Sequence, residues 1–165
     1  MNTSSALLRA DIRDEVARLR RAVTDFREAV AGIDLSAAEL PSFTKAAIGS
    51  YLHSFYTGCE HVFRSISAFF ENELDQVRWH ADLLKRMRLE IPGVRPRVLT
   101  DALAAELDLY RGFRHVFREA YGFELDWRRL RPLAERLGEV SSETFAQIER
   151  FAAELPEEVL GADSP

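Results

Sequence analysis

The sequence predicts an all-α fold, an antiparallel bundle of about five helices. Apolar residues repeat at spacings of three and four along most of the 165-residue chain, which is typical of amphipathic helices. No long stretch alternates apolar and polar residues with the period of two that marks a half-buried strand. Glycine, proline and serine gather at a few points between the periodic segments, where turns are expected.

A first helix is expected near the N-terminus. It is predicted from a stripe formed by Ile12, Val16, Leu19, Val23 and Phe26, whose spacing buries one side of a helix. Gly32 is expected to end this helix, because glycine is favoured just after a helix C-terminus. Residues 33–43 then form a connection in which Ser36 or Ser42 is a candidate N-cap.

A second helix is predicted from about residue 43 to about residue 74. Its apolar positions are Ile48, Leu52, Phe55, Cys59, Val62, Phe63, Ile66, Phe69 and Phe70. Small residues lie among them, including Gly49 and Gly58, and they permit a close approach of helices or subunits. This helix offers more apolar positions than one bundle face of its length hides, so we expect a homodimer.

The third and fourth helices flank a loop. A short helix fits residues 77–88, and the prolines and glycine of the segment E-I-P-G-V-R-P force a loop over residues 90–96. Thr100 is a good N-cap for the fourth helix, which Gly122 is expected to end.

The fifth helix is predicted to start near Asp126. Gly138 and the pair Ser141 and Ser142 are expected to bend or split it, since glycine and serine weaken a helix interior. The tail after Pro156 is expected to fray.

Length and composition describe one domain over residues 1–165, with a core from about residue 8 to about residue 155. No apolar run approaches the roughly 20 residues that cross a bilayer, and we expect no signal peptide, because the first residues lack a basic region and soon become charged. The single cysteine fits a reducing compartment, so we expect a cytoplasmic protein. The net charge of −5 argues against a general nucleic-acid coat protein but leaves room for a local basic site.

The segment Y-R-G-F-R-H-V-F-R-E-A-Y concentrates the chemistry of the chain. In a helix it brings Arg111, His115 and Arg118 to one side, with Arg114 nearby. A histidine can act as acid or base near neutral pH, and an arginine can hold a phosphate. This set suits cleavage of RNA without a metal. The alternative is an exposed ladder of ion pairs with Asp108 and Glu119, of small energetic worth.

The remaining residues give weaker signals. His53, His61 and His80 are isolated, without cysteine or carboxylate partners at metal-ligand spacing. No nucleotide-binding or phosphate-binding fingerprint is present, so we expect neither a metal nor a cofactor.

Three segments together resemble the HEPN superfamily, specifically the HepT-like ribonuclease toxins. They read F-R-H-V-F-R-E-A-Y-G-F-E-L-D-W, L-E-I-P-G-V-R-P and S-F-Y-T-G-C-E-H-V-F. The resemblance implies an all-α bundle that dimerises through its long helices and acts as a metal-independent endoribonuclease, often the toxin of a toxin–antitoxin pair. It also implies a nucleotidyltransferase antitoxin that modifies a tyrosine beside the catalytic histidine.

The family motif is an arginine, four residues, a histidine, one residue and a tyrosine. Here His115 matches the histidine, whereas Tyr110 and Phe117 stand at the arginine and tyrosine positions. The arginine role then passes to Arg111 or Arg114, and Tyr121 replaces the modified tyrosine. Arg118 and Tyr110 are expected to contact the RNA. The alternative is a catalytically degenerate subunit that binds a nucleotidyltransferase.

Overall fold

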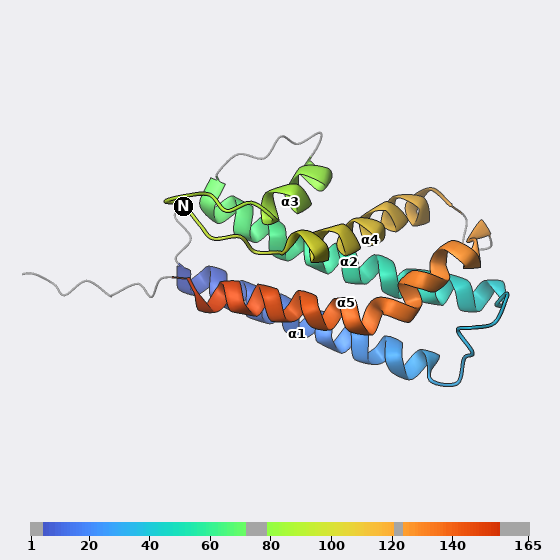
Figure 1. The fold of residues 1–165 in the computed structure, drawn as a ribbon. Coiled ribbons are helices and arrows are strands. Elements are labelled where there is room, and N and C mark those ends of the chain that lie inside the picture. Colours follow the sequence, from blue (N-terminus) through green and yellow to red (C-terminus); the bar gives the residue numbers. More distant parts are fainter. Residues whose placement is uncertain (1–4, 72–78, 121–123, 156–165) are drawn as a thin grey trace, which may run out of the picture.

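The computed structural model describes residues 5–71, 79–120 and 124–155. Five helices make up most of this part: α1 (Ser5–Val30), α2 (Ser42–Glu71), α3 (Trp79–Met87), α4 (Asp101–Glu119) and α5 (Trp127–Ala153). The four long helices lie alongside one another and alternate in direction, and the short α3 lies to one side (Figure 1). Within the described residues there is no strand beyond one isolated bridge between Ile91 and Arg95. The predicted all-α antiparallel bundle is confirmed.

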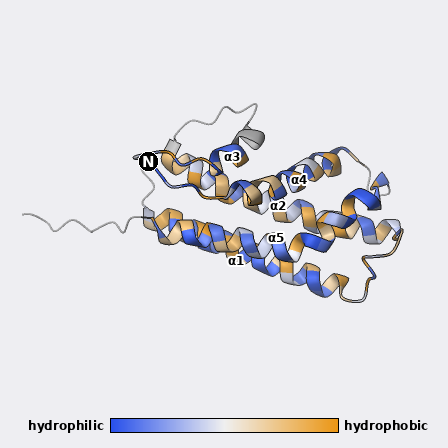
Figure 2. Ribbon diagram, viewed as in Figure 1, coloured by the Kyte–Doolittle hydropathy of each residue, from blue (hydrophilic) through white to orange (hydrophobic). Residues whose placement is uncertain are grey.

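Helix α2 occupies the centre of the bundle and packs against all four other helices. Its apolar residues from Ile48 to Ile66 are buried inside the chain's own core, which also takes in one side of α1, α4 and α5. The long helices carry both hydrophobic and hydrophilic residues, as expected of an amphipathic bundle (Figure 2). The phenylalanine-rich part of α2 is therefore covered within one chain, and it does not by itself call for a second subunit.

Close helix approach explains the small residues of α2. A Cβ atom placed on Gly58 would lie 2.3 Å from Cδ2 of Leu19 on α1. One placed on Gly49 would lie 3.0 Å from the ring of Phe117 on α4. Both glycines thus let a neighbouring helix pack directly against the backbone of α2, as the sequence predicted.

The predicted caps of α4 and α5 are confirmed. The Thr100 hydroxyl accepts a hydrogen bond from the backbone N–H of Leu103, and the Asp126 carboxylate accepts one from Arg128. These bonds satisfy amide groups that a helix start otherwise leaves unpaired. Each cap fixes where its helix begins, and so which side chains face the core.

The other predicted boundaries have mixed outcomes. Helix α1 ends at Val30, two residues before Gly32. Helix α5 runs without a break through Gly138 and Ser141, so of the expected bend or split, the split is wrong. The Ser141 hydroxyl donates to the Gly138 carbonyl, which ties this part of the helix to itself. The predicted end of α4 at residue 122 and the tail after residue 155 lie outside the described residues.

No helix in the described part of the chain has the length and apolarity needed to span a membrane.

The contact at Gly58 gives a stability test. Gly58→Ala is expected to lower the free energy of unfolding by about 1–3 kcal/mol, the usual cost of adding a methyl group to a packed contact. Gly138→Ala is the matched control: its Cβ would meet open space, and alanine in a helix interior is worth about 0.5–1 kcal/mol over glycine. Urea unfolding of both variants measures the difference. Equal effects would contradict the close approach of α1 and α2.

Candidate functional site

The predicted site residues lie on the C-terminal half of α4. His115 and Arg118 are exposed to solvent, and Arg111 is partly exposed. The side chains of His115 and Arg118 form no ion pair or hydrogen bond with another residue in the described part of the chain. These two side chains are thus available to a ligand, whereas the two other arginines of the segment are not.

Arg111 is engaged by an acidic neighbour one turn earlier. Its Nε lies 2.7 Å from Oδ1 of Asp108, and both side chains are partly exposed. This i,i+3 contact is one of the exposed ion pairs expected under the alternative in which the segment forms a ladder with Asp108 and Glu119. Such surface pairs contribute little to stability, but this one gives the guanidinium a carboxylate partner that a phosphate would have to displace.

Arg114 points into the bundle. Its Nη1 lies 3.0 Å from Oε2 of Glu60 on α2, and the two side chains are 16% and 2% exposed. A carboxylate buried to this degree needs a cation beside it, because an unpaired charge in the interior is strongly unfavourable. Arg114 therefore joins α4 to α2, and its charge is already balanced by Glu60.

The position of Tyr110 contradicts the expectation that this residue contacts RNA. Its side chain is fully buried, and its hydroxyl donates a 2.8 Å hydrogen bond to the backbone carbonyl of Leu133 on α5. Its ring meets Phe55 edge to face in the core. Burial also raises the pKa of this hydroxyl. Tyr110 thus holds α4 against α5 and cannot contact an RNA substrate. Tyr121, the expected acceptor of a modification, lies outside the described residues.

His53 on α2 is a candidate that sequence reasoning set aside as isolated. Its ring packs on Phe117 of α4, with ring centres 5.2 Å apart. Its Nδ1 is buried and has no hydrogen-bond partner within the described residues. Burial, followed by the positive charges of Arg114 and Arg118, lowers the pKa of His53 below its usual 6.5, and Glu60 opposes the shift in part. The fold therefore brings a neutral imidazole to the arginines of α4.

This arrangement has a definite chemical capacity. A neutral imidazole accepts a proton, and the exposed guanidinium of Arg118 can hold a phosphate oxygen. No group of three or more histidine, cysteine, aspartate or glutamate side chains suited to a metal ion occurs in the described ranges. The fold and the site together define the class of protein. It is a helical bundle whose fourth helix carries exposed histidine and arginine side chains.

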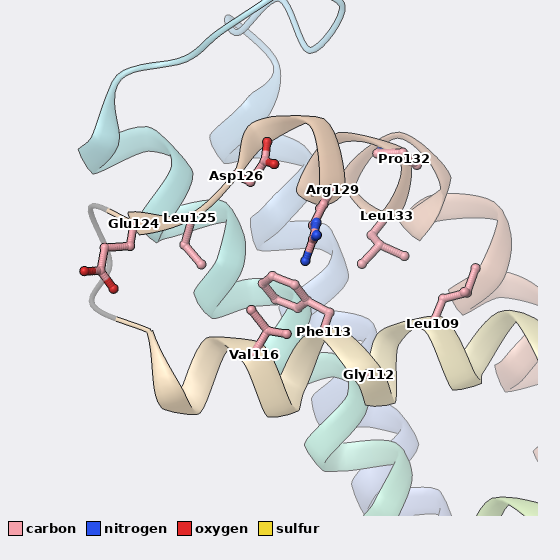
Figure 3. Close-up of a pocket in the computed structure, with 10 residues that line it drawn as sticks. All are labelled: Leu109, Gly112, Phe113, Val116, Glu124, Leu125, Asp126, Arg129, Pro132 and Leu133. Atoms are coloured by element: carbon pink, nitrogen blue, oxygen red, sulfur yellow. The ribbon is translucent and has the colours of Figure 1, made fainter.

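An apolar groove lies beside this site, between α4 and the start of α5 (Figure 3). It encloses about 520 Å³. Leu109, Val116 and Leu133 are among its lining residues, and the side chain of Arg129 lies above the ring of Phe113. None of the predicted site residues in the described part of the chain lines the groove. Its apolar walls suit a hydrophobic partner better than a phosphate.

Comparison with known proteins places the chain in a family. The model of a family described as HepT-like protein matches residues 47–155, which is more than half of the chain. No curated protein and no solved structure gives a match. The chain therefore belongs to the HepT-like family of the HEPN superfamily.

The motif that the resemblance implies can also be placed four residues later in the chain. In the placement described above, only His115 matches one of the three motif positions. After the shift, Arg114 stands at the arginine position and Tyr121 at the tyrosine position, and Glu119 replaces the histidine.

The environment of His53 gives a pH test. Because its pKa is lowered in the folded state, unfolded chains take up a proton first as the pH falls below about 6.5. The contribution of His53 to stability is therefore complete above that pH and is lost as the pH falls toward the folded-state pKa. Urea unfolding between pH 7 and pH 5 should show a smaller decline for His53→Gln than for the wild type.

Nuclear magnetic resonance titration of His53 separates the causes of this shift. Arg118→Gln should raise the pKa of His53 toward 6.5, because one of the two nearby positive charges is removed. Arg131→Gln is the control. In the wild type the guanidinium of Arg131 pairs with Glu135 on the same helix, α5, so its removal should leave the pKa of His53 unchanged. A His53 pKa above 6.5 in the wild type would contradict the described environment.

Proposed function

We propose that this chain is a HepT-like subunit that does not cleave RNA by itself and acts by binding a nucleotidyltransferase-type partner. The observation that carries the proposal is the combination of Glu119 at the histidine position of the motif and Arg114 bound to a buried carboxylate. In this proposal the family's toxin–antitoxin context supplies the partner, and Tyr121 is the residue that the partner modifies.

The chemistry of RNA cleavage supports a loss of activity. Without a metal, one group must remove the 2′-hydroxyl proton, another must protonate the leaving oxygen, and a cation must stabilise the charge on the phosphate. Glu119 is exposed at the end of α4, and a carboxylate there repels phosphate and does not replace an imidazole. Arg114 faces Glu60 across the helix contact, so its charge does not serve a phosphate at the surface.

A second candidate function is metal-independent endoribonuclease activity of the HepT-like type, which would make the chain the toxin of a pair. His115 and Arg118 favour it, since both are exposed and unengaged within the described residues. Here His115 is the acid or base, and Arg118 holds phosphate in place of Arg111 and Arg114. His53, kept neutral beside the same helix, is a further candidate base.

One experiment separates the two candidates. Total RNA is incubated in EDTA with the wild type, Glu119→His, Glu119→Gln and His115→Ala, and fragmentation is followed on a gel. We expect no cleavage by the wild type or by any of the variants, because Arg114 stays bound to Glu60 even where Glu119→His supplies an imidazole. Glu119→Gln is the matched control: it removes the charge without adding an imidazole, and should stay inactive.

Cleavage by the wild type that disappears in His115→Ala would overturn the first proposal and establish the ribonuclease. Co-expression with a nucleotidyltransferase from the same genetic neighbourhood tests the binding role directly. We expect the two proteins to co-purify. A chain that cleaves nothing and also binds no such partner would contradict both candidates.

A further inference from the structure

The apolar groove between α4 and α5 has the size and the lining of a small-molecule site. Its volume of about 520 Å³ lies within the ~300–1,000 Å³ typical of such sites. Leu109 and Val116 of α4, which are 56% and 44% exposed, form its walls together with Pro132 and Leu133 of α5 (Figure 3). Apolar walls that are open to water favour a ligand with an apolar body, because binding removes their surface from solvent.

Gly112 keeps the α4 side of this groove open. It lies in the interior of the helix, where alanine is the better helix former. A Cβ atom on Gly112 would meet nothing within 4 Å, so no contact within the described part of the chain requires a glycine there. The residue lines the groove, and a larger side chain would occupy part of it. The glycine thus preserves volume in the groove at some expense to the helix.

One charged side chain, that of Arg129, lies in the groove without a close partner. Its guanidinium lies above the ring of Phe113 (Figure 3), and it forms no ion pair or hydrogen bond within the described residues. The Asp126 carboxylate is occupied, because it accepts hydrogen bonds of 3.0 to 3.2 Å from the backbone N–H and the guanidinium of Arg128. The Glu124 carboxylate points away from Arg129 in Figure 3. Arg129 therefore offers its planar set of donors to a ligand.

The charge of the groove selects the head group of that ligand. A wholly apolar ligand would cover the guanidinium of Arg129 and leave it without a hydrogen-bond partner, which is unfavourable. A phosphate carries more negative charge and would meet Glu124 and Asp126 at the same end of the groove. A single carboxylate pairs with one arginine through two parallel hydrogen bonds. The groove is thus complementary to one carboxylate on an apolar body.

We propose that the groove binds a monocarboxylate with a linear apolar chain, of the kind found in medium-chain fatty acids. Its carboxylate binds Arg129, and its chain lies between α4 and the start of α5. Leu109 and Val116 are separated by about 10 Å along the helix axis, a span that suits a medium-length chain. The inference goes beyond the proposed function and holds whether or not RNA is cleaved.

Isothermal titration calorimetry with decanoate, kept below the concentration at which it forms micelles, measures binding. We expect saturable binding that weakens about tenfold in Arg129→Gln, because the charge-assisted hydrogen bonds are lost. Arg131→Gln is the matched control: Arg131 lies two residues later on α5, pairs with Glu135 and does not line the groove, so this variant should bind as the wild type does.

Decanol, which has the same chain without the charge, isolates the role of the guanidinium. It should bind the wild type and Arg129→Gln with equal affinity. The same ratio of decanoate affinity to decanol affinity in both proteins would overturn the assignment of the carboxylate to Arg129.

Gly112→Leu tests the position of the chain. Leucine fills the groove and is a better helix former than glycine, so the variant should stay folded by circular dichroism and lose decanoate binding. Gly138→Leu is the matched control, since a Cβ atom there also meets open space but outside the groove. Undiminished binding by Gly112→Leu would overturn the proposed site, as would a wild type that shows no saturable binding at millimolar decanoate. Loss of a nucleotidyltransferase from Gly112→Leu, with no decanoate bound by the wild type, would assign the groove to that protein instead.

Discussion

The ion pair between Glu60 on α2 and Arg114 on α4 sets the rotation of α4 about its own axis. A carboxylate that deep in the bundle needs its cation in one place, and Arg114 reaches it only when α4 presents this side to α2. Everything else on the helix follows from that orientation. Tyr110 faces α5, and His115 and Arg118 are exposed to solvent.

The helices and their starts were predictable because their determinants are local. Amphipathic spacing marks α1, α2, α4 and α5, and a threonine or aspartate placed just before a helix can satisfy its free amides without help from distant residues. The split expected at Gly138 shows the limit of such reasoning. Glycine weakens a helix by an amount that packing against neighbours readily offsets, so its presence alone does not break α5.

The site was less predictable because its properties arise between helices. The periodicity of α4 gives the side on which Arg114 lies, but not the buried carboxylate it meets, since Glu60 is 54 residues earlier in the chain. His53 gave no signal in sequence because its pKa is lowered by burial and by charges on another helix. Tyr110 was expected to contact RNA, whereas its hydroxyl donates to a backbone carbonyl on α5 that the sequence does not reveal.

The central position of α2 also determines which parts of the molecule can unfold locally and which unfold only with the whole bundle. Helix α2 packs against every other helix, whereas the nine-residue α3 packs mainly on α2 and α4. Amide protons in the middle of α2 can exchange with solvent only when most of the bundle comes apart, so their exchange reports global unfolding. Those of α3 can exchange through a local opening that leaves the four long helices in place. The cost of that local opening is set by Leu83, Leu84 and Met87, the side chains of α3 that are buried in the core, and it is smaller than the cost of opening the whole bundle.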